Sequence, residues 1–254
     1  MKAYCVETAA IRYNLEKLTR LAGKTPIWAV LKGNGYGLGT GEMAKLCHEA
    51  GIRRFCVTEI SEAMDIRMQF AQAEILMLRP TTDLGELQQM LDLDVIATIS
   101  CSAEAAALNS LAGQRGTVAE VHVKVDTGMG RYGFMPHETE KILSVYLHND
   151  NLAVSGIYTH FHSAFCNENS VFAQAETFKG VLNALIKAGV DPGMAHCCNS
   201  AAFLRWPELH MGGVRLGSAL LGRVLVKADL RRVGRCEATV DEIRWLPTGH
   251  STGY

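Results

Sequence analysis

The stretch EVHVKVDTGMGRYGF, residues 120–134, decides the fold. Three valines alternate in it with the ionisable side chains of His122, Lys124 and Asp126. Alternate residues of a strand face opposite sides of a sheet, so the valines would pack under outer helices and the polar side chains would line a closed interior. Three ionisable groups in a row are costly to bury unless they are paired or functional. The stretch therefore predicts a barrel strand that carries part of a site.

Seven other short apolar runs accompany this one, with helical patterns between them. The expected strands are 27–32, 54–58, 74–79, 94–99, 120–127, 153–160, 195–199 and 213–216. The expected helices are 8–21, 41–50, 59–69, 84–91, 103–112, 138–147, 170–188 and 201–204. Strands that alternate with helices indicate βαβ units and a parallel sheet. Eight such units in roughly 220 residues predict a (β/α)8 TIM-type barrel, with a doubly wound sheet as the alternative.

The alternation of strand and helix patterns ends near the end of the chain. Between Arg235 and Tyr254, Val240, Ile243 and Trp245 alternate with polar residues ahead of turn residues. We therefore expect the barrel to occupy residues 1–222, and residues 223–254 to form a linker and the start of an incomplete β-rich C-terminal domain.

Bulk composition narrows the class of protein. A chain of 254 residues with 48% hydrophobic and 20% charged residues is expected to fold around a large core. The 25 Lys and Arg balance 26 Asp and Glu, so no basic excess predicts a nucleic-acid partner. No run of about 18 apolar residues predicts a membrane span. The eight cysteines include no C-x-x-C pair, which argues against a metal site and favours reduced thiols in the cytoplasm.

Catalytic groups of barrel proteins lie at the C-terminal ends of the strands. Lys32 closes the run 27–32, and the loop GNGYGLG, which contains Tyr36, follows directly. Partial desolvation lowers the pKa of a lysine and makes it a nucleophile for Schiff-base chemistry. A glycine-rich loop can present N–H groups to a phosphate. The ordinary alternatives are a lysine that extends to solvent and a simple turn.

Other strand ends carry polar residues. These are Arg131, His160, His196, Asn199, Ser200, Arg215, Gly217 and Ser218. Arg131 is suited to a bidentate contact with a carboxylate. Asn199 and Ser200 precede a short helix, where they would cap it or contact a phosphate. Gly217 and Ser218 could offer backbone N–H groups to the same phosphate, since barrels often place such a site after strands seven and eight.

Together these motifs identify a family resemblance. KGNGYGLG, residues 32–39, resembles the pyridoxal-phosphate lysine motif of alanine racemases. KVDTGMGR (124–131), THF (159–161), NSA (199–201) and VRLG (214–217) are similar to later motifs of that family, in the same order and at similar spacing. The resemblance covers nearly the whole chain and implies a fold-type III enzyme that binds pyridoxal 5'-phosphate (PLP).

The resemblance also implies roles for individual residues. Lys32 would bind PLP covalently and act as one base, and Tyr254 would be the second base, reaching across a homodimer. The residues implied to hold the phosphate are Tyr36, Asn199, Ser200, Gly217 and Ser218. Around the ring, the resemblance implies His160 on the pyridine face and Arg215 at the ring nitrogen, with His196 behind Arg215. It implies that Arg131 binds the substrate carboxylate. It also implies that Lys124 is a lysine that can be carbamylated. The sequence departs from the family at Gly33, Gly35, Leu38 and Leu221.

Arg215 has a chemical consequence of its own. A guanidinium stays protonated and can only donate a hydrogen bond, so it would leave the pyridine nitrogen unprotonated and weaken the ring as an electron sink. Removal and return of one proton at Cα remain feasible, which favours racemisation over aminotransfer.

The expected function is therefore interconversion of L- and D-alanine, with D-alanine supplied for cell-wall synthesis. The alternatives are a serine racemase of the same family and a non-catalytic single-barrel PLP-binding protein. The chain is expected to lack most of the family's C-terminal domain and to be weakly active alone.

Overall fold

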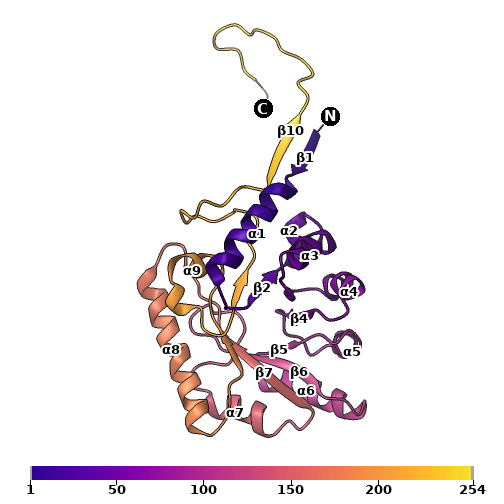
Figure 1. The fold of residues 1–254 in the computed structure, drawn as a ribbon, viewed down its shortest axis with the longest axis vertical. Helices are drawn as coiled ribbons and strands as arrows, with labels where there is room; N and C mark the ends of the chain where they lie inside the picture. The colour runs from indigo at the N-terminus through magenta and orange to yellow at the C-terminus, as the bar shows by residue number, and fades with distance from the viewer. Residues whose placement is uncertain (1, 253–254) are drawn as a thin grey trace.

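The computed structural model describes residues 2–252, and eight parallel strands form its centre (Figure 1). One sheet has the order β4–β3–β2–β9 and contains Glu74–Met77, Arg54–Val57, Ile27–Val30 and Val214–Leu216. The other has the order β5–β6–β7–β8 and contains Ala97–Ile99, Ala119–Lys124, Leu152–Tyr158 and Met194–His196. Parallel bridges Leu76↔Ile96 and His196↔Gly213 join the two sheets at both edges. The ring therefore closes, which confirms the (β/α)8 barrel over the doubly wound alternative.

The expected helices are also present, and they lie outside the ring. They are α3 (Thr40–Glu49), α4 (Ile60–Gln69), α5 (Leu84–Asp92), α6 (Ser102–Gln114), α7 (Thr139–Leu147), α8 (Glu168–Lys187) and α9 (Ser200–Arg205), with the 3-10 turn η1 (Pro207–Leu209) after α9. Helix α1 (Thr8–Ala22) precedes the first barrel strand and contacts α3. Its Asn14 side chain donates to the carbonyls of Leu220 and Arg231, so α1 also packs on the chain that follows β9. None of the helices described between residues 2 and 252 is long and apolar enough to cross a membrane.

The packing confirms the two faces predicted for residues 121–126. The valines of β6 lie in the large core between strands and helices, together with buried residues of the helices. A second, smaller core fills the barrel interior and consists of Trp28, Val30, Cys56, Leu76 and Ile96. His122 faces that interior, with its ring centroid 5.5 Å from that of Trp28. The polar face of the strand thus looks into the barrel, as expected from period-two alternation.

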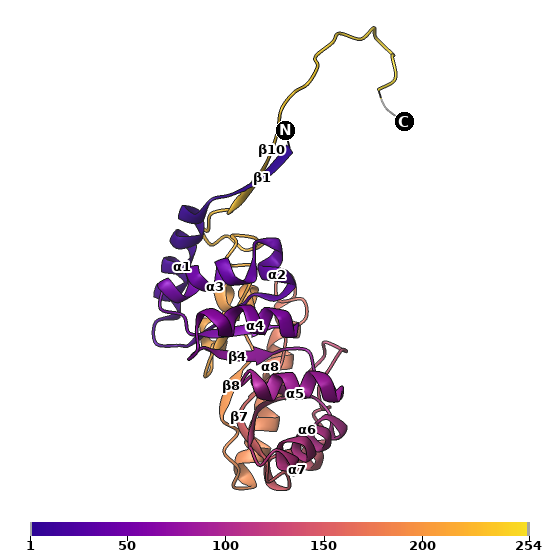
Figure 2. The same cartoon turned by 90° about the vertical axis from the view of Figure 1, so that its right-hand side faces the viewer.

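A two-stranded ribbon projects from the barrel. Strand β1 (Lys2–Val6) pairs antiparallel with β10 (Gly234–Ala238), with Tyr4 opposite Cys236 (Figures 1 and 2). The β-rich region predicted from Arg235 thus begins with one strand. Residues 239–252 form no helix or strand, and Trp245 is 98% exposed, so the further strand expected there is absent from the described residues. Apart from the turn in which the His250 N–H donates to the carbonyl of Pro247, no described residue offers these residues a backbone partner, and an unpaired strand is not stable in water. The division at residue 222 stays a prediction.

Candidate active site

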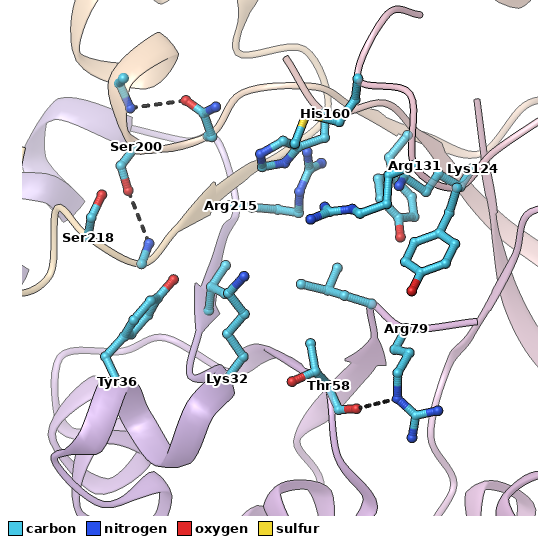
Figure 3. Close-up of a pocket in the computed structure, with 18 of the residues that line it drawn as sticks. Lys32, Tyr36, Thr58, Arg79, Lys124, Arg131, His160, Ser200, Arg215 and Ser218 are labelled. Atoms are coloured by element: carbon cyan, nitrogen blue, oxygen red, sulfur yellow. Dashed lines mark hydrogen bonds between the residues drawn. The ribbon is translucent and has the colours of Figure 1, made fainter. Parts of the chain in front are cut away.

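A cavity of about 580 Å³ opens at the carboxyl ends of the barrel strands (Figure 3). Ten of the predicted site residues line it, namely Lys32, Tyr36, Lys124, Arg131, His160, Asn199, Ser200, Arg215, Gly217 and Ser218. His196 is fully buried beneath it. Tyr254, the expected second base, lies outside the described residues. The structure thus brings together nearly all the predicted residues, from positions spread over most of the sequence.

Nine other lining residues were not among the predicted site residues. They are Val30, Thr58, Leu78, Arg79, Met129, Tyr132, Tyr158, Phe165 and Ala201. Thr58 and Arg79 close two predicted strands, so the strand-end rule that identified Lys32 could have found them. Met129 and Tyr132 flank Arg131 on its turn. Phe165 lies in a loop after β7, and nothing in the sequence pattern marks it.

The chain makes a left-handed helical turn directly after Lys32. The φ angles of Gly33, Asn34, Gly35 and Tyr36 are +65°, +53°, +62° and +57°. This conformation costs a residue with a Cβ about 1–2 kcal/mol, so only the two glycines adopt it freely. The turn directs the side chains of Lys32 and Tyr36 into the same cavity (Figure 3). The sequence predicted a glycine-rich loop here but not its handedness.

Polar groups converge at one end of the cavity. Ser200 Oγ accepts hydrogen bonds from the backbone N–H groups of Gly217, at 3.1 Å, and Ala219, at 3.2 Å. A Cβ at position 217 would lie only 2.2 Å from Tyr36 Oη, so glycine is what allows the Tyr36 hydroxyl to reach this place. Asn199 lines the same end, with its side-chain oxygen capping α9. The hydroxyl groups of Tyr36 and Ser200 thus lie where the sequence predicts a phosphate, whereas the Gly217 N–H donates to Ser200 and the Asn199 amide donates to the carbonyl of Phe161.

Arg215 is 3% exposed and is held by a network inside the barrel. Its guanidinium donates to the carbonyl of Thr159 at 2.6 Å and to His196 Nδ1, and His196 Nε2 lies 3.0 Å from His122 Nδ1. Because a guanidinium only donates, His196 must accept at Nδ1 and donate from Nε2 to His122. Burial and the charge of Arg215 lower the pKa of His122 to about 3, so this network carries its charge on Arg215.

His160 contributes a neutral ring to the cavity wall. Burial lowers its pKa to about 3, and the charges of Arg215 and Arg131 act in the same direction. An uncharged imidazole can pack against an aromatic ring. The contact of His160 with a pyridine stays a prediction.

A second group of cations faces the cavity from the end of β6. Burial, followed by the charges of Arg131 and Arg215, lowers the pKa of Lys124 to about 8. Asp126 fixes the turn that carries Arg131, since its carboxylate accepts from the N–H groups of Gly128, Gly130 and Arg131 at 2.9–3.1 Å. No carboxylate is among the described residues that line the cavity, whereas several cations are. The cavity therefore suits a ligand with more than one anionic group.

The fold and the site define a (β/α)8-barrel protein with a strand-end lysine in a cationic cavity at the carboxyl ends of its strands. The chain matches the family "Alanine racemase, N-terminal domain" over residues 6–224, and it belongs to that family.

Relatives and solved structures agree with this assignment. The chain is 37% identical to alanine racemase of Desulforamulus reducens over 221 residues, which is 85% of this chain and 59% of the relative. It is 32% identical to alanine racemase of Symbiobacterium thermophilum, over 98% of this chain and 67% of the relative. The solved alanine racemase of Streptomyces lavendulae superposes with a TM-score of 0.90 at 26% identity, covering 100% of this chain and 69% of the other. The chain thus spans about three fifths of the length of relatives such as the first.

Proposed function

We propose that this chain is the barrel part of a PLP-dependent amino-acid racemase that interconverts L- and D-alanine. The observation that carries the proposal is the joint presence of Lys32 and Arg215 in one cavity, with the hydroxyl groups of Tyr36, Ser200 and Ser218 at its end. No described residue holds Lys32 Nζ in a hydrogen bond or ion pair. The amine is therefore available for covalent attachment of a carbonyl-bearing cofactor.

The residues present fit PLP. The hydroxyl groups of Tyr36, Ser200 and Ser218 would hold the phosphate, with Ser200 oriented by the N–H groups of Gly217 and Ala219. The lack of space for a Cβ at Gly217 is what such a close cradle requires. Lys32 would bind the carbonyl carbon, and His160 would pack on the ring. When bound, PLP supplies a conjugated ring that stabilises negative charge at the substrate Cα.

The residues of this chain set how strongly the ring withdraws electrons. Arg215 can only donate to a ring nitrogen, and His196, which supports it, is fully buried with a pKa well below its usual value. This network has no proton to give to the pyridine, so the ring would remain a modest electron sink. That limitation favours removal and return of one Cα proton over amino-group transfer.

Proton transfer at Cα requires one base on each face for inversion. Lys32 Nζ would hold or take the proton on one face, and we predict that Tyr254 serves the other face. Arg131 would bind the substrate carboxylate and so fix which bond to Cα faces the bases.

Lys124 is suited to a further step. Its lowered pKa leaves a fraction of neutral amine near pH 7, which can add to CO2. An N–C bond forms, one proton leaves to solvent, and the anionic carbamate would pair with Arg131.

The wider role of the protein follows from this proposal. We predict a homodimer in the cytoplasm that supplies D-alanine for cell-wall synthesis and takes alanine rather than serine. The eight free cysteines of the chain agree with a reducing compartment.

Two measurements test the proposal. The chain is incubated with PLP, reduced with borohydride and digested, and mass spectrometry is expected to find the adduct on Lys32. Proton NMR in D2O then follows loss of the α-hydrogen signal from L- and D-alanine, with L- and D-serine in parallel. Replacement of the α-hydrogen by deuterium in one enantiomer of alanine needs a single base and hence only Lys32. Conversion of one enantiomer into the other needs both bases.

Lys32→Ala should abolish the adduct and the exchange. Lys45→Ala, at an exposed position on α3, is the matched control and should keep both. Binding of PLP without exchange of either enantiomer would identify a non-catalytic PLP-binding protein instead, and absence of PLP binding would refute the proposal altogether.

A further inference from the structure

Glu62 is a buried carboxylate that joins two walls of the cavity. Its side chain is 5% exposed and lies in the first turn of α4. Oε2 accepts from the N–H groups of Thr58, at 2.9 Å, and Glu59, at 3.2 Å, which is the capping arrangement of that helix. Oε1 accepts from the N–H of Asn34 at 2.8 Å. One carboxylate thus caps α4 and also reaches the left-handed turn after Lys32.

The Asn34 amide needs such a partner. It lies in the middle of the left-handed turn, at a φ of +53°, where a residue with a Cβ is disfavoured by about 1–2 kcal/mol. Its side-chain oxygen accepts from the Thr40 N–H at 3.0 Å, which ties it to the start of α3. Glu62 and Thr40 therefore hold Asn34 from two sides, and a hydrogen bond to a charged acceptor is strong enough to offset the strain.

We infer that Glu62 is a positioning residue that sets the directions of Lys32 and Tyr36 through Asn34. Lys32 and Tyr36 lie on either side of Asn34, and their side chains enter the cavity from this one turn (Figure 3). If the Asn34 N–H lost its hydrogen bond to Glu62, the turn would loosen and both side chains could rotate away from the cofactor. The inference rests on the proposed function, in which these two residues hold PLP.

The chain contains a matched comparison for Glu62. Glu104 occupies the equivalent place in the first turn of α6 and accepts from the N–H groups of Ser100, at 2.6 Å, and Cys101, at 3.1 Å. Its other oxygen accepts from the hydroxyl of Ser100. All of its hydrogen bonds thus stay within its own helix cap, so a change at Glu104 removes a capping carboxylate without touching the turn after Lys32. Its charge also acts on Lys124 at the far side of the cavity, as the last and smallest of the effects on the pKa of that lysine.

Glutamine at position 62 is a selective perturbation. An amide keeps one acceptor oxygen, and its NH2 group cannot accept from a backbone N–H. Two cap amides compete with the single amide of Asn34 for that oxygen. We expect the oxygen to stay with the cap, so that the NH2 group faces the Asn34 N–H and the turn loses its anchor.

The test compares Glu62→Gln with Glu104→Gln in the full 254-residue chain. Hydrogen–deuterium exchange without PLP is expected to speed up at least about tenfold in residues 33–36 of Glu62→Gln only, as for loss of one bond to a charged group. The PLP dissociation constant should rise at least about tenfold in the same variant, while Glu104→Gln matches the wild type in both measurements. Glu62→Gln should also lose more thermal stability than Glu104→Gln, because only Glu62→Gln leaves the backbone N–H of Asn34 without its acceptor.

Equal turn protection and equal PLP affinity in the two variants would overturn the inference. If Glu62→Gln does not fold, Glu62→Asp serves instead, because its shorter side chain keeps the charge but cannot span cap and turn together. A wild-type chain that fails to bind PLP on Lys32 would refute the proposed function. The rate of hydrogen–deuterium exchange in residues 33–36 would still decide whether Glu62 anchors this turn.

Discussion

Gly217→Ala is the sharpest perturbation of the predicted phosphate cradle. The added Cβ would lie 2.2 Å from Tyr36 Oη and 2.9 Å from its Cζ, whereas real Cβ atoms essentially never approach other heavy atoms below 3.0 Å. The tyrosine hydroxyl must therefore move by at least 0.8 Å, away from the position in which it reaches the cradle. Tyr36 lines an open cavity and can swing into it, so the change should affect binding more than folding.

The size of the effect follows from the bond that is lost. A hydrogen bond to a charged group such as a phosphate contributes about 1.5–3 kcal/mol. At about 1.4 kcal/mol per factor of ten, the PLP dissociation constant should rise by about 10-fold to 150-fold. The free energy of unfolding of the chain without PLP should fall by less than about 1 kcal/mol, because a half-buried side chain can relax.

A double-mutant cycle with Tyr36→Phe makes the assay specific. PLP affinity is measured by absorbance titration of the wild type, both single variants and the double variant. Phenylalanine removes the atom that clashes most, so Gly217→Ala should cost little more in that background and the two losses should not add. Gly180→Ala is the control, since nothing lies within 4 Å of its added Cβ and helix α8 should gain about 0.5–1 kcal/mol. Unchanged affinity in Gly217→Ala, or equal losses in both backgrounds, would refute the reasoning.

Two further predictions concern titratable groups. Lys124 should form a carbamate in 13C-labelled bicarbonate, visible as a new carbon NMR signal that strengthens as the pH rises toward 8; Arg131→Gln should weaken it, because loss of the neighbouring cation raises the pKa of Lys124 and leaves the carbamate unpaired. His122 titrates near pH 3 when folded and near 6.5 when unfolded, so the unfolded chain binds the extra proton between these values and stability should fall as the pH drops below 6.5. The free energy of unfolding, measured by urea titration from pH 6.5 to 5, should fall by up to about 1.4 kcal/mol per pH unit because of this residue. His122→Gln should reduce that slope by the same amount. A slope that the substitution leaves unchanged would contradict the low pKa of His122.

The sequence predicts the barrel well because its signals are local. Alternation in residues 121–126 predicts the face of each side chain, and a lysine at a strand end predicts the position of the site. The same rule applies to Thr58 and Arg79, which end their strands at the cavity wall. The resemblance added the roles of residues whose types alone leave several possibilities, such as His160.

Other features depend on contacts that no local pattern contains. Asn34 and Tyr36 adopt a left-handed conformation because Glu62, almost thirty residues away, holds the turn. His122 belongs to the predicted polar face, yet its pairing with His196 follows only from ring closure. Val240 and Trp245 have a strand-like pattern, but a strand needs a neighbour, and none is described for them.

The ribbon of β1 and β10 has a consequence for biosynthesis. Strand β1 leaves the ribosome before the barrel strands, and its partner near residue 236 is made only after all eight of them. Until then the backbone groups of β1 have no partner, and such an unpaired edge is prone to pair with another chain. Nascent chains arrested before β10 should therefore be the most aggregation-prone form of this protein, and the ribbon should be among the last contacts to form.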